Sequence, residues 1–246
     1  MKILGIIPAR YASTRFPAKA LADLGGKSVI QRVYEQASKN QAIQTLIVAT
    51  DHEKIYDHVL GFGGNVTLTS PNHRSGTDRC IEVVQKLEDR FDYVINIQGD
   101  EPFISPELIN ALIHLFDGET QIATLIKPIS DESDLFDPNI VKVVKNILNE
   151  AIYFSRATIP FLRGIEKEEW FDKHTFYKHL GIYGYRTDVL IDIADLSVSS
   201  LEKSESLEQL RWLENGFKIK IAETNQGILG IDTPEDLEKA KEFMKK

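Results

Sequence analysis

The 246-residue sequence has a single cysteine, Cys80, and no apolar run long enough to cross a membrane. One cysteine cannot form an internal disulfide, which is typical of a reducing compartment. The residues around Cys80 fit a helix, so we interpret it as an inert, partly buried thiol. The apolar run at 3–7 is broken by Pro8 and is too short for a secretory signal. We therefore expect a cytoplasmic protein without a membrane partner.

Positive charge is also scarce. Lys and Arg total 29 against 37 Asp and Glu, which gives a formal net charge of −8. An acidic surface is a poor match for a nucleic-acid backbone, so we expect no nucleic-acid partner. A small anionic ligand remains compatible with this charge if positive groups are concentrated in a cleft.

Two common nucleotide-binding signatures are missing. The segment "GGKS" (25–28) resembles the end of a Walker A loop, but position 21, where that loop needs glycine, is Leu21. No G-x-G-x-x-G follows the first expected strand, which disfavours a dinucleotide-dependent dehydrogenase. We interpret Gly25 and Gly26 as a turn before a helix.

The sequence does contain a regular alternation of short apolar runs and amphipathic segments. We expect strands at 2–7, 45–50, 65–69 and 93–98. Helices are expected between and after them, with caps at Ser28, Asp51 and Ser105. This alternation predicts an α/β fold with a mostly parallel sheet flanked by helices.

The pattern becomes β-rich between residues 125 and 186, where "VKVVKN", "EAIYFSR" and "KHLGIYGYR" read as strands. We expect a single α/β domain over residues 1–246 that carries an inserted β-rich lobe at 125–186. After the lobe the pattern indicates further elements in this order: helices at 187–195 and 204–214, strands at 217–222 and 228–231, and a last helix after Thr233.

The segment "GIIPARYASTRFPAK" (5–19) concentrates positive charge and contains no acidic residue. It follows the first expected strand, and ligands of open parallel sheets bind beyond the carboxyl ends of the strands. Its cations, which suit phosphate oxygens, are Arg10, Arg15 and Lys19. Its small residues, which let backbone N–H groups approach a phosphate, are Ala9, Ala12 and Ser13. A solvated basic loop is the alternative, which the surrounding apolar residues disfavour.

Two acidic residues are also expected beyond strand ends. Asp100 lies in a turn after the fourth strand, and Asp232 lies after the last one. Asp232 could instead cap the last helix, but Thr233 and Asp236 already form a plausible cap there. Two carboxylates that face a basic loop suit Mg²⁺ held between the protein and phosphates.

Other polar groups leave both a binding and a structural interpretation open. The segment "HRSGTDR" (73–79) can read a base or cap a helix equally well. Arg156 and His179, taken alone, are more often structural in strands. His179 and Tyr183 are separated by an even offset, so they share one face of a strand and can line one pocket.

Taken together, eight ordered segments resemble the 3-deoxy-manno-octulosonate cytidylyltransferases, or CMP-Kdo synthetases, of Gram-negative bacteria, over essentially the whole chain. They are "IIPARYASTRFPAK", "VATD", "HRSGTDR", "NIQGDEP", "YFSRATIP", "HLGIYGYR", "LEQLR" and "GIDTPEDLE". The resemblance implies a nucleotide-diphospho-sugar transferase fold and a Mg²⁺-dependent transfer of CMP from CTP to Kdo for lipopolysaccharide biosynthesis. It also implies a homodimer formed through the inserted lobe.

The same resemblance implies roles for individual residues. The catalytic residues would be Arg10, Lys19, Asp100 and Asp232, and the last two would bind Mg²⁺. The CTP-binding residues would be Pro8, Ala9, Arg10, Ser13, Arg15, Lys19, Arg74 and Ser75. The Kdo-binding residues would be Gln98, Arg156, His179, Tyr183, Glu205 and Glu208.

The chain departs from the family pattern at two positions. Ala18 and Ser28 stand where the family commonly has glycine and proline. Neither change removes a charge. A close relative acting on another acid sugar, such as a sialic acid or 8-amino-Kdo, is the nearest alternative. A nucleotide-binding regulator without catalysis is a second alternative. Such a protein could lose Lys19, Asp100 or Asp232, but all three are present.

Overall fold

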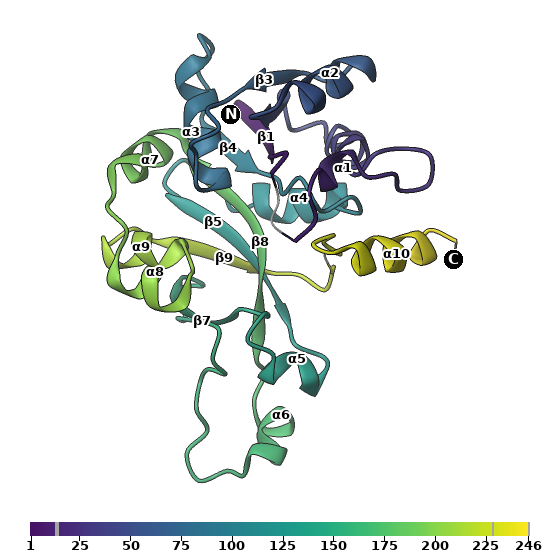
Figure 1. Ribbon diagram of the computed structural model, residues 1–246. Coiled ribbons are helices and arrows are strands. Elements are labelled where there is room, and N and C mark those ends of the chain that lie inside the picture. The colour runs from purple at the N-terminus through teal and green to yellow at the C-terminus, as the bar shows by residue number, and fades with distance from the viewer. Residues whose placement is uncertain (13–14, 228, 246) are drawn as a thin grey trace. The chain divides into compact units, whose positions relative to one another are not determined.

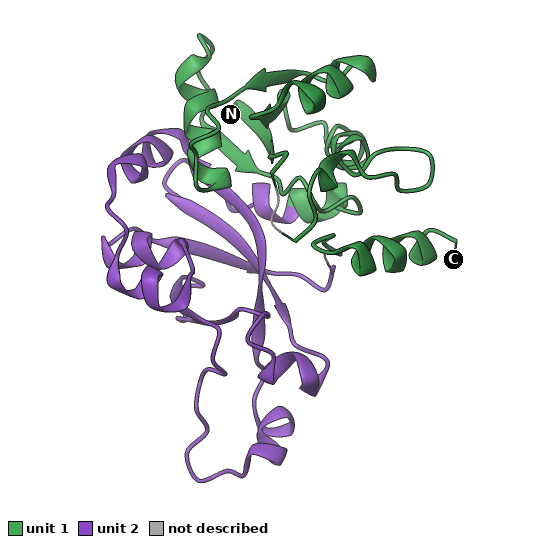
Figure 2. Cartoon of the chain, viewed as in Figure 1, with its two compact units in different colours: residues 1–110, 228–246 green, residues 111–227 purple. Residues whose placement is uncertain are grey.

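The protein was analysed as a computed structural model, which describes residues 1–12, 15–227 and 229–245. The chain divides into two compact units (Figure 2). Unit 1 comprises residues 1–110 and 228–246, and unit 2 comprises residues 111–227. The predicted lobe, residues 125–186, lies inside unit 2, which extends beyond it in the sequence at both ends.

Unit 1 is an open parallel sheet with the strand order β3–β2–β1–β4 (Figure 1). The central strand β1 is almost entirely buried, because neighbouring strands flank it and helices cover the sheet. The strands are β1 (Ile3–Ala9), β2 (Thr45–Thr50), β3 (Val66–Leu68) and β4 (Tyr93–Asn96). The helices of unit 1 are α1 (Val29–Ala37), α2 (Glu53–Gly61), α3 (Gly76–Lys86), α4 (Pro106–Ile113, which ends in unit 2) and α10 (Pro234–Phe243).

Side-chain caps begin several of these helices where the sequence predicts them. Ser28 Oγ accepts the Gln31 N–H at α1, and Thr233 with Asp236 forms a complete capping box at α10. The prediction that Asp51 caps α2 is wrong, because His52 is the N-cap residue and its ring nitrogen accepts the Lys54 N–H. Asp51 is instead held by partners outside the helix.

Unit 2 is built on a long strand, β8 (Tyr177–Arg186), which pairs antiparallel with β5 (Ile122–Pro128). β5 also pairs in parallel with β9 (Ile219–Glu223). The hairpin of β6 (Lys142–Lys145) and β7 (Ala151–Ser155) joins the other side of β8 through β6. The helices are α5 (Glu132–Phe136), α6 (Trp170–Lys173), α7 (Thr187–Asp192), α8 (Ser200–Glu205) and α9 (Gln209–Glu214).

A β-bulge interrupts the pairing of β5 with β8. Thr124 pairs with Tyr183, but the next residue, Leu125, pairs with Leu180. Two extra residues of β8 are therefore accommodated at this point. Because their number is even, the alternation of β8 side chains between the two faces of the sheet continues unchanged across the bulge.

Two predicted elements differ from the structure. The helix expected at 204–214 is two helices, because Ser206 adopts a left-handed conformation (φ 53°) that ends α8. Residues 229–231 are not in a strand, and Ile228 lies outside the described residues.

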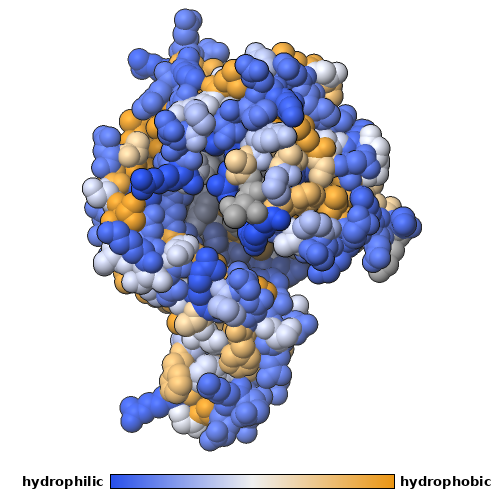
Figure 3. Space-filling view, viewed as in Figure 1, coloured by the Kyte–Doolittle hydropathy of each residue, from blue (hydrophilic) through white to orange (hydrophobic). Residues whose placement is uncertain are grey.

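The visible face of the molecule is mostly polar (Figure 3). Figure 3 shows a face on which hydrophilic side chains dominate, with smaller hydrophobic patches between them. Among the residues that the structure describes, no helix is both long and apolar enough to span a membrane.

Candidate active site

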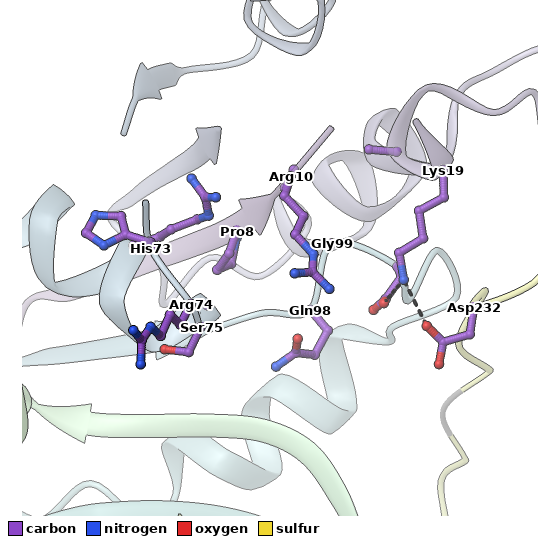
Figure 4. Close-up of a pocket in the computed structure, with 14 residues that line it drawn as sticks. Pro8, Arg10, Lys19, His73, Arg74, Ser75, Gln98, Gly99 and Asp232 are labelled. Atoms are coloured by element: carbon purple, nitrogen blue, oxygen red, sulfur yellow. Dashed lines mark hydrogen bonds and ion pairs between the residues drawn. The ribbon is translucent and has the colours of Figure 1, made fainter. Parts of the chain in front are cut away.

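A cavity of about 240 Å³ lies beyond the carboxyl ends of β1 and β4 in unit 1 (Figure 4). Ligands of open parallel sheets bind where the strand order reverses. Here the order reverses at β1, which has β2 on one side and β4 on the other. Most of the cavity lining was predicted from sequence: Pro8, Ala9, Arg10, Lys19, Arg74, Ser75, Gln98, Asp100 and Asp232. The remaining residues of the lining are Ala20, His73, Gly76, Arg79 and Gly99.

Lys19 joins the two predicted metal-binding carboxylates. Its Nζ lies 2.5 Å from Asp100 Oδ2 and 3.0 Å from Asp232 Oδ1. Burial of the amine opposes its charge, but the attraction and hydrogen bonds of Asp100 and then Asp232 outweigh burial and raise the pKa of Lys19. Lys19 is therefore a cation at neutral pH, held by two carboxylates that lie 81 and 213 positions away in the sequence.

The two arginines of the basic segment differ in their contacts. Arg10 lines the cavity, and its guanidinium has no hydrogen bond or ion pair with any other described residue. Figure 4 shows its side chain extending toward Gln98. Arg15 does not line the cavity, but it forms an exposed ion pair with Asp232 at 3.1 Å. Ser13, also predicted to bind CTP, lies outside the described residues.

Arg79 is a cavity residue that the sequence reasoning did not single out. It is 3% exposed, and its guanidinium donates to Asp51 Oδ2 at 2.7 Å and to Thr69 Oγ1 at 2.7 Å. The other oxygen of Asp51 accepts the backbone N–H of Tyr11 at 3.1 Å. Asp51 therefore ties the start of the basic segment to a buried arginine of the cavity wall. The feature of the sequence that could have pointed to Arg79 is its position at the end of the polar segment "HRSGTDR" (73–79).

The segment 73–79 caps a helix and also lines the cavity, while its contact with a base stays a prediction. Ser75 is the N-cap residue of α3 and forms a capping box with Asp78. Ser75 and Arg74 also line the cavity. A capped helix start with nearby backbone N–H groups is a suitable edge for an anionic or polar ligand.

Glycine is required at position 99 by a close backbone approach. A Cβ atom at Gly99 would lie 2.5 Å from the carbonyl oxygen of Pro8, which is far closer than real Cβ contacts. The turn that carries Gln98 and Asp100 can therefore pack directly on the end of β1.

The other predicted sugar-binding residues lie in unit 2. His179 and Tyr183 have ring centroids 5.2 Å apart, so the two rings do share one face of β8. Tyr183 Oη is buried without a hydrogen-bond partner among the described residues. Burial, and then the negative charge of Glu208, raises the pKa of Tyr183 well above its usual value.

Arg156 and Glu205 are packed together. Glu205 accepts hydrogen bonds from Ser155 Oγ at 2.6 Å and from the Arg156 N–H at 2.9 Å. The Arg156 guanidinium donates to three backbone carbonyls, those of Glu205, Pro138 and Ser206. A guanidinium has five N–H groups, so two N–H groups of Arg156 remain for a ligand.

The donor set in unit 1 fits a divalent cation that shares its coordination with a ligand. Asp100 and Asp232 already converge on one positive atom, Lys19 Nζ. Among the described residues, no three His, Cys, Asp or Glu side chains are grouped to hold a metal by themselves. Mg²⁺ commonly binds one or two carboxylates together with phosphate oxygens and water. The two aspartates are therefore suited to Mg²⁺ that arrives with a phosphate ligand.

Comparison with solved structures gives a full-length match. A structure of CMP:2-keto-3-deoxy-manno-octonic acid synthetase complexed with CTP is 41% identical, with a TM-score of 0.92, and the match covers 100% of this chain and 99% of that chain. A 4-diphosphocytidyl-2C-methyl-D-erythritol synthase from Anaerococcus prevotii is 16% identical, with a TM-score of 0.65 and coverage of 100% and 99%, and shares the fold.

Comparison of sequences agrees with the structural match. The 3-deoxy-manno-octulosonate cytidylyltransferase of Parabacteroides distasonis is 58% identical, over 99% of this chain and 98% of the relative. That of Bacteroides thetaiotaomicron is 57% identical, over 100% and 99%. The cytidylyltransferase family model matches residues 4–221. On this evidence the chain belongs to the cytidylyltransferase family, among the 3-deoxy-manno-octulosonate cytidylyltransferases.

Proposed function

We propose that this protein transfers CMP from CTP to the anomeric hydroxyl of Kdo and releases pyrophosphate. The hydroxyl oxygen forms a bond to the α-phosphorus, the bond from that phosphorus to the bridging oxygen of pyrophosphate breaks, and the hydroxyl proton is released. The observation that carries the proposal is Lys19, which lies in the unit 1 cavity between Asp100 and Asp232. Phosphoryl-type transfer needs a protein mainly for positioning and charge neutralisation, which these groups supply.

CTP is the ligand that we assign to the cavity. The charge of Arg10, which is unpaired among the described residues, and the ammonium of Lys19 would attract the phosphates. Pro8, Ala9 and the segment 73–76 line the same cavity and would frame the cytosine. We expect this frame to favour a pyrimidine over the larger purines, and hydrogen bonding at the base edge would have to reject UTP.

Mg²⁺ is the cofactor that we assign to Asp100 and Asp232. When bound, it would neutralise charge on the phosphates and orient the α-phosphate. Lys19 Nζ lies between the two aspartates. Because one cation already sits between them, we infer that Lys19 exchanges its carboxylate partners for phosphate oxygens when CTP binds.

Kdo is the acceptor that we assign to Gln98 and to the residues of unit 2. The two spare N–H groups of Arg156 can hold its carboxylate, while His179 and Tyr183 offer polar groups to its hydroxyls. Glu205 and Glu208 complete the proposed set. Glu205 acts largely through Arg156, because its carboxylate accepts a hydrogen bond from the backbone N–H of Arg156. We infer that the product, CMP-Kdo, supplies lipopolysaccharide biosynthesis in the cytoplasm.

We also propose that the protein works as a homodimer formed through the β-rich part of unit 2. Large apolar side chains are exposed there, with Ile147 98% exposed and Phe161 71% exposed. Exposed apolar groups of this size are common at interfaces. Sedimentation velocity of the purified protein tests this, and a monomer at micromolar concentration would reject it.

Pyrophosphate release tests the catalytic proposal. The reaction contains CTP, Mg²⁺ and one acid sugar from a panel of Kdo, 8-amino-Kdo and a sialic acid. We expect turnover with Kdo and strong preference for CTP over ATP and GTP. Turnover with another sugar alone would reassign the acceptor, and CTP binding without turnover on any sugar would indicate a nucleotide-binding regulator.

A further inference from the structure

The bulge in unit 2 gathers three polar groups around one buried hydroxyl. Thr124 is fully buried, and its Oγ1 lies 2.8 Å from the Ile182 carbonyl oxygen and 3.2 Å from that of Leu180. The same oxygen lies 3.0 Å from His179 Nε2. The arrangement lies at the bulge, because Ile182 is one of its two extra residues and Leu180 is the residue at which pairing with β5 resumes.

Counting protons decides how His179 is protonated. A threonine hydroxyl has one proton and two acceptor lone pairs, whereas a carbonyl oxygen can only accept. The proton of Thr124 must therefore point to a carbonyl, since otherwise two carbonyl oxygens would face its lone pairs without any hydrogen. The hydroxyl is left as an acceptor toward the ring. His179 Nε2 therefore carries a hydrogen and donates it to Thr124.

His179 is also neutral. Phe154 and Tyr183 pack against its ring, with centroids 5.1 Å and 5.2 Å away. Burial lowers the pKa of His179 to about 3. A neutral imidazole with hydrogen on Nε2 has an unprotonated Nδ1, which is an acceptor. No other described residue forms a hydrogen bond with this nitrogen.

We propose that Thr124 is a positioning residue, which takes the Nε2–H of His179 and leaves Nδ1 as an uncharged acceptor for a hydroxyl group of the sugar acid. This inference rests on the proposed function, in which His179 binds that substrate. It excludes His179 as the cation for the sugar carboxylate, and that task falls to Arg156. It also makes Thr124 a determinant of sugar recognition, although it contacts the substrate only through His179.

The tautomer is tested without substrate, by ¹⁵N NMR of protein labelled at histidine at pH 7. The unmodified protein is expected to show a protonated Nε2 and an unprotonated Nδ1 for His179, assigned by comparison with His179→Gln. Thr124→Val is expected to change these shifts, and Thr124→Ser to preserve them. Thr158→Val is the matched control, because Thr158 donates to the Leu135 carbonyl in the same unit without contacting a histidine.

An Nδ1–H tautomer or an imidazolium in the unmodified protein would overturn the proposal. The NMR measurement does not depend on turnover, so it tests the tautomer separately from the proposed function. It also stands if Thr124→Val fails to fold, because it needs only the unmodified protein and Thr124→Ser.

Sugar recognition is tested by kinetics of two histidine variants. His179→Asn can place its side-chain oxygen near the position of Nδ1, whereas His179→Gln reaches toward Thr124 and offers nothing near Nδ1. We expect the apparent KM for Kdo to rise about tenfold in His179→Gln and Thr124→Val, and less in His179→Asn and Thr124→Ser, with little change for CTP. Equal losses in both histidine variants, or unchanged Kdo kinetics with a confirmed tautomer, would reject the role of Nδ1 in binding the sugar.

Discussion

Lys19 Nζ donates a hydrogen bond of 2.5 Å to Asp100 Oδ2, across 81 positions of the sequence. Asp232 shares the same ammonium group. The residue proposed to neutralise phosphates is thus paired with the residues proposed to bind Mg²⁺. Arg15 also pairs with Asp232, so two carboxylates and two cations leave this cluster without net charge.

Replacing either aspartate should abolish most turnover. Asp100→Asn and Asp232→Asn each remove one charge from the pair around Lys19, and loss of one such group commonly lowers kcat about 10²–10³-fold. Pyrophosphate release at saturating Mg²⁺ measures the effect. Asp57→Asn, an exposed position on α2, is the control and should keep normal activity. Near-normal turnover of either site variant would remove that residue from the metal site.

Asp51 should matter for both stability and CTP binding. Its pair with Arg79 is buried, and breaking such a pair costs about 3–5 kcal/mol. Asp51→Asn should therefore lower the free energy of unfolding in urea and raise the KM for CTP, because Tyr11 and Arg79 both lose a charged partner. Asp188→Asn breaks the more exposed pair with Arg186 and should change stability by less than about 1 kcal/mol. Equal effects of the two variants would contradict a special role for Asp51.

Gly99 should tolerate no side chain. The new Cβ of Gly99→Ala would lie 2.5 Å from the Pro8 carbonyl oxygen, so the turn that carries Asp100 has to move. We expect a destabilisation of about 1–3 kcal/mol and a lower kcat/KM. Gly61→Ala is the matched control, because nothing lies within 4 Å of its added Cβ. If both variants behave alike in thermal unfolding and turnover, the close approach at position 99 is not a constraint.

Ala18 occupies a position where glycine should be better. Its φ of 57° is left-handed, which costs a residue with a Cβ about 1–2 kcal/mol. Ala18→Gly removes that cost but adds about 0.4–1 kcal/mol of unfolded-state entropy, so a net gain of up to about 1.6 kcal/mol is expected. Ala22→Gly changes a residue with φ −62° and should destabilise instead. Urea unfolding of both variants gives the comparison, and the same sign for both would disagree with it.

Arg156→Lys should weaken Kdo use more than CTP use. A lysine keeps the charge but cannot reproduce three donations to backbone carbonyls and still offer two further N–H groups. The apparent KM for each substrate in the variant, together with its melting temperature, separates binding from folding. A loss confined to CTP, or a loss of stability with unchanged KM for Kdo, would make Arg156 a structural residue.

The elements of unit 1 were largely predictable because their signals are local. Strand β1 follows from a short apolar run, and the start of α10 follows from Thr233 and Asp236 within one turn. The basic segment was recognisable for the same reason, since Arg10 and Lys19 lie within ten residues of a strand end. The cap of α2 was misassigned between neighbours, because Asp51 and His52 can both accept a helix N–H.

The amino-acid sequence by itself determined the alternation of strands and helices in unit 1, the caps of α1 and α10, and which residues carry charge. Tertiary structure alone decided which of those charges meet. Asp232 reaches Lys19 across 213 positions, and Thr124 meets His179 across 55. No periodicity or motif in the sequence marks either pairing. The first depends on the strand order, and the second depends on the bulge in the register of β5 and β8. Hydrogen-bond partners at such separations are selected by the packing of the whole sheet, and no local propensity encodes them.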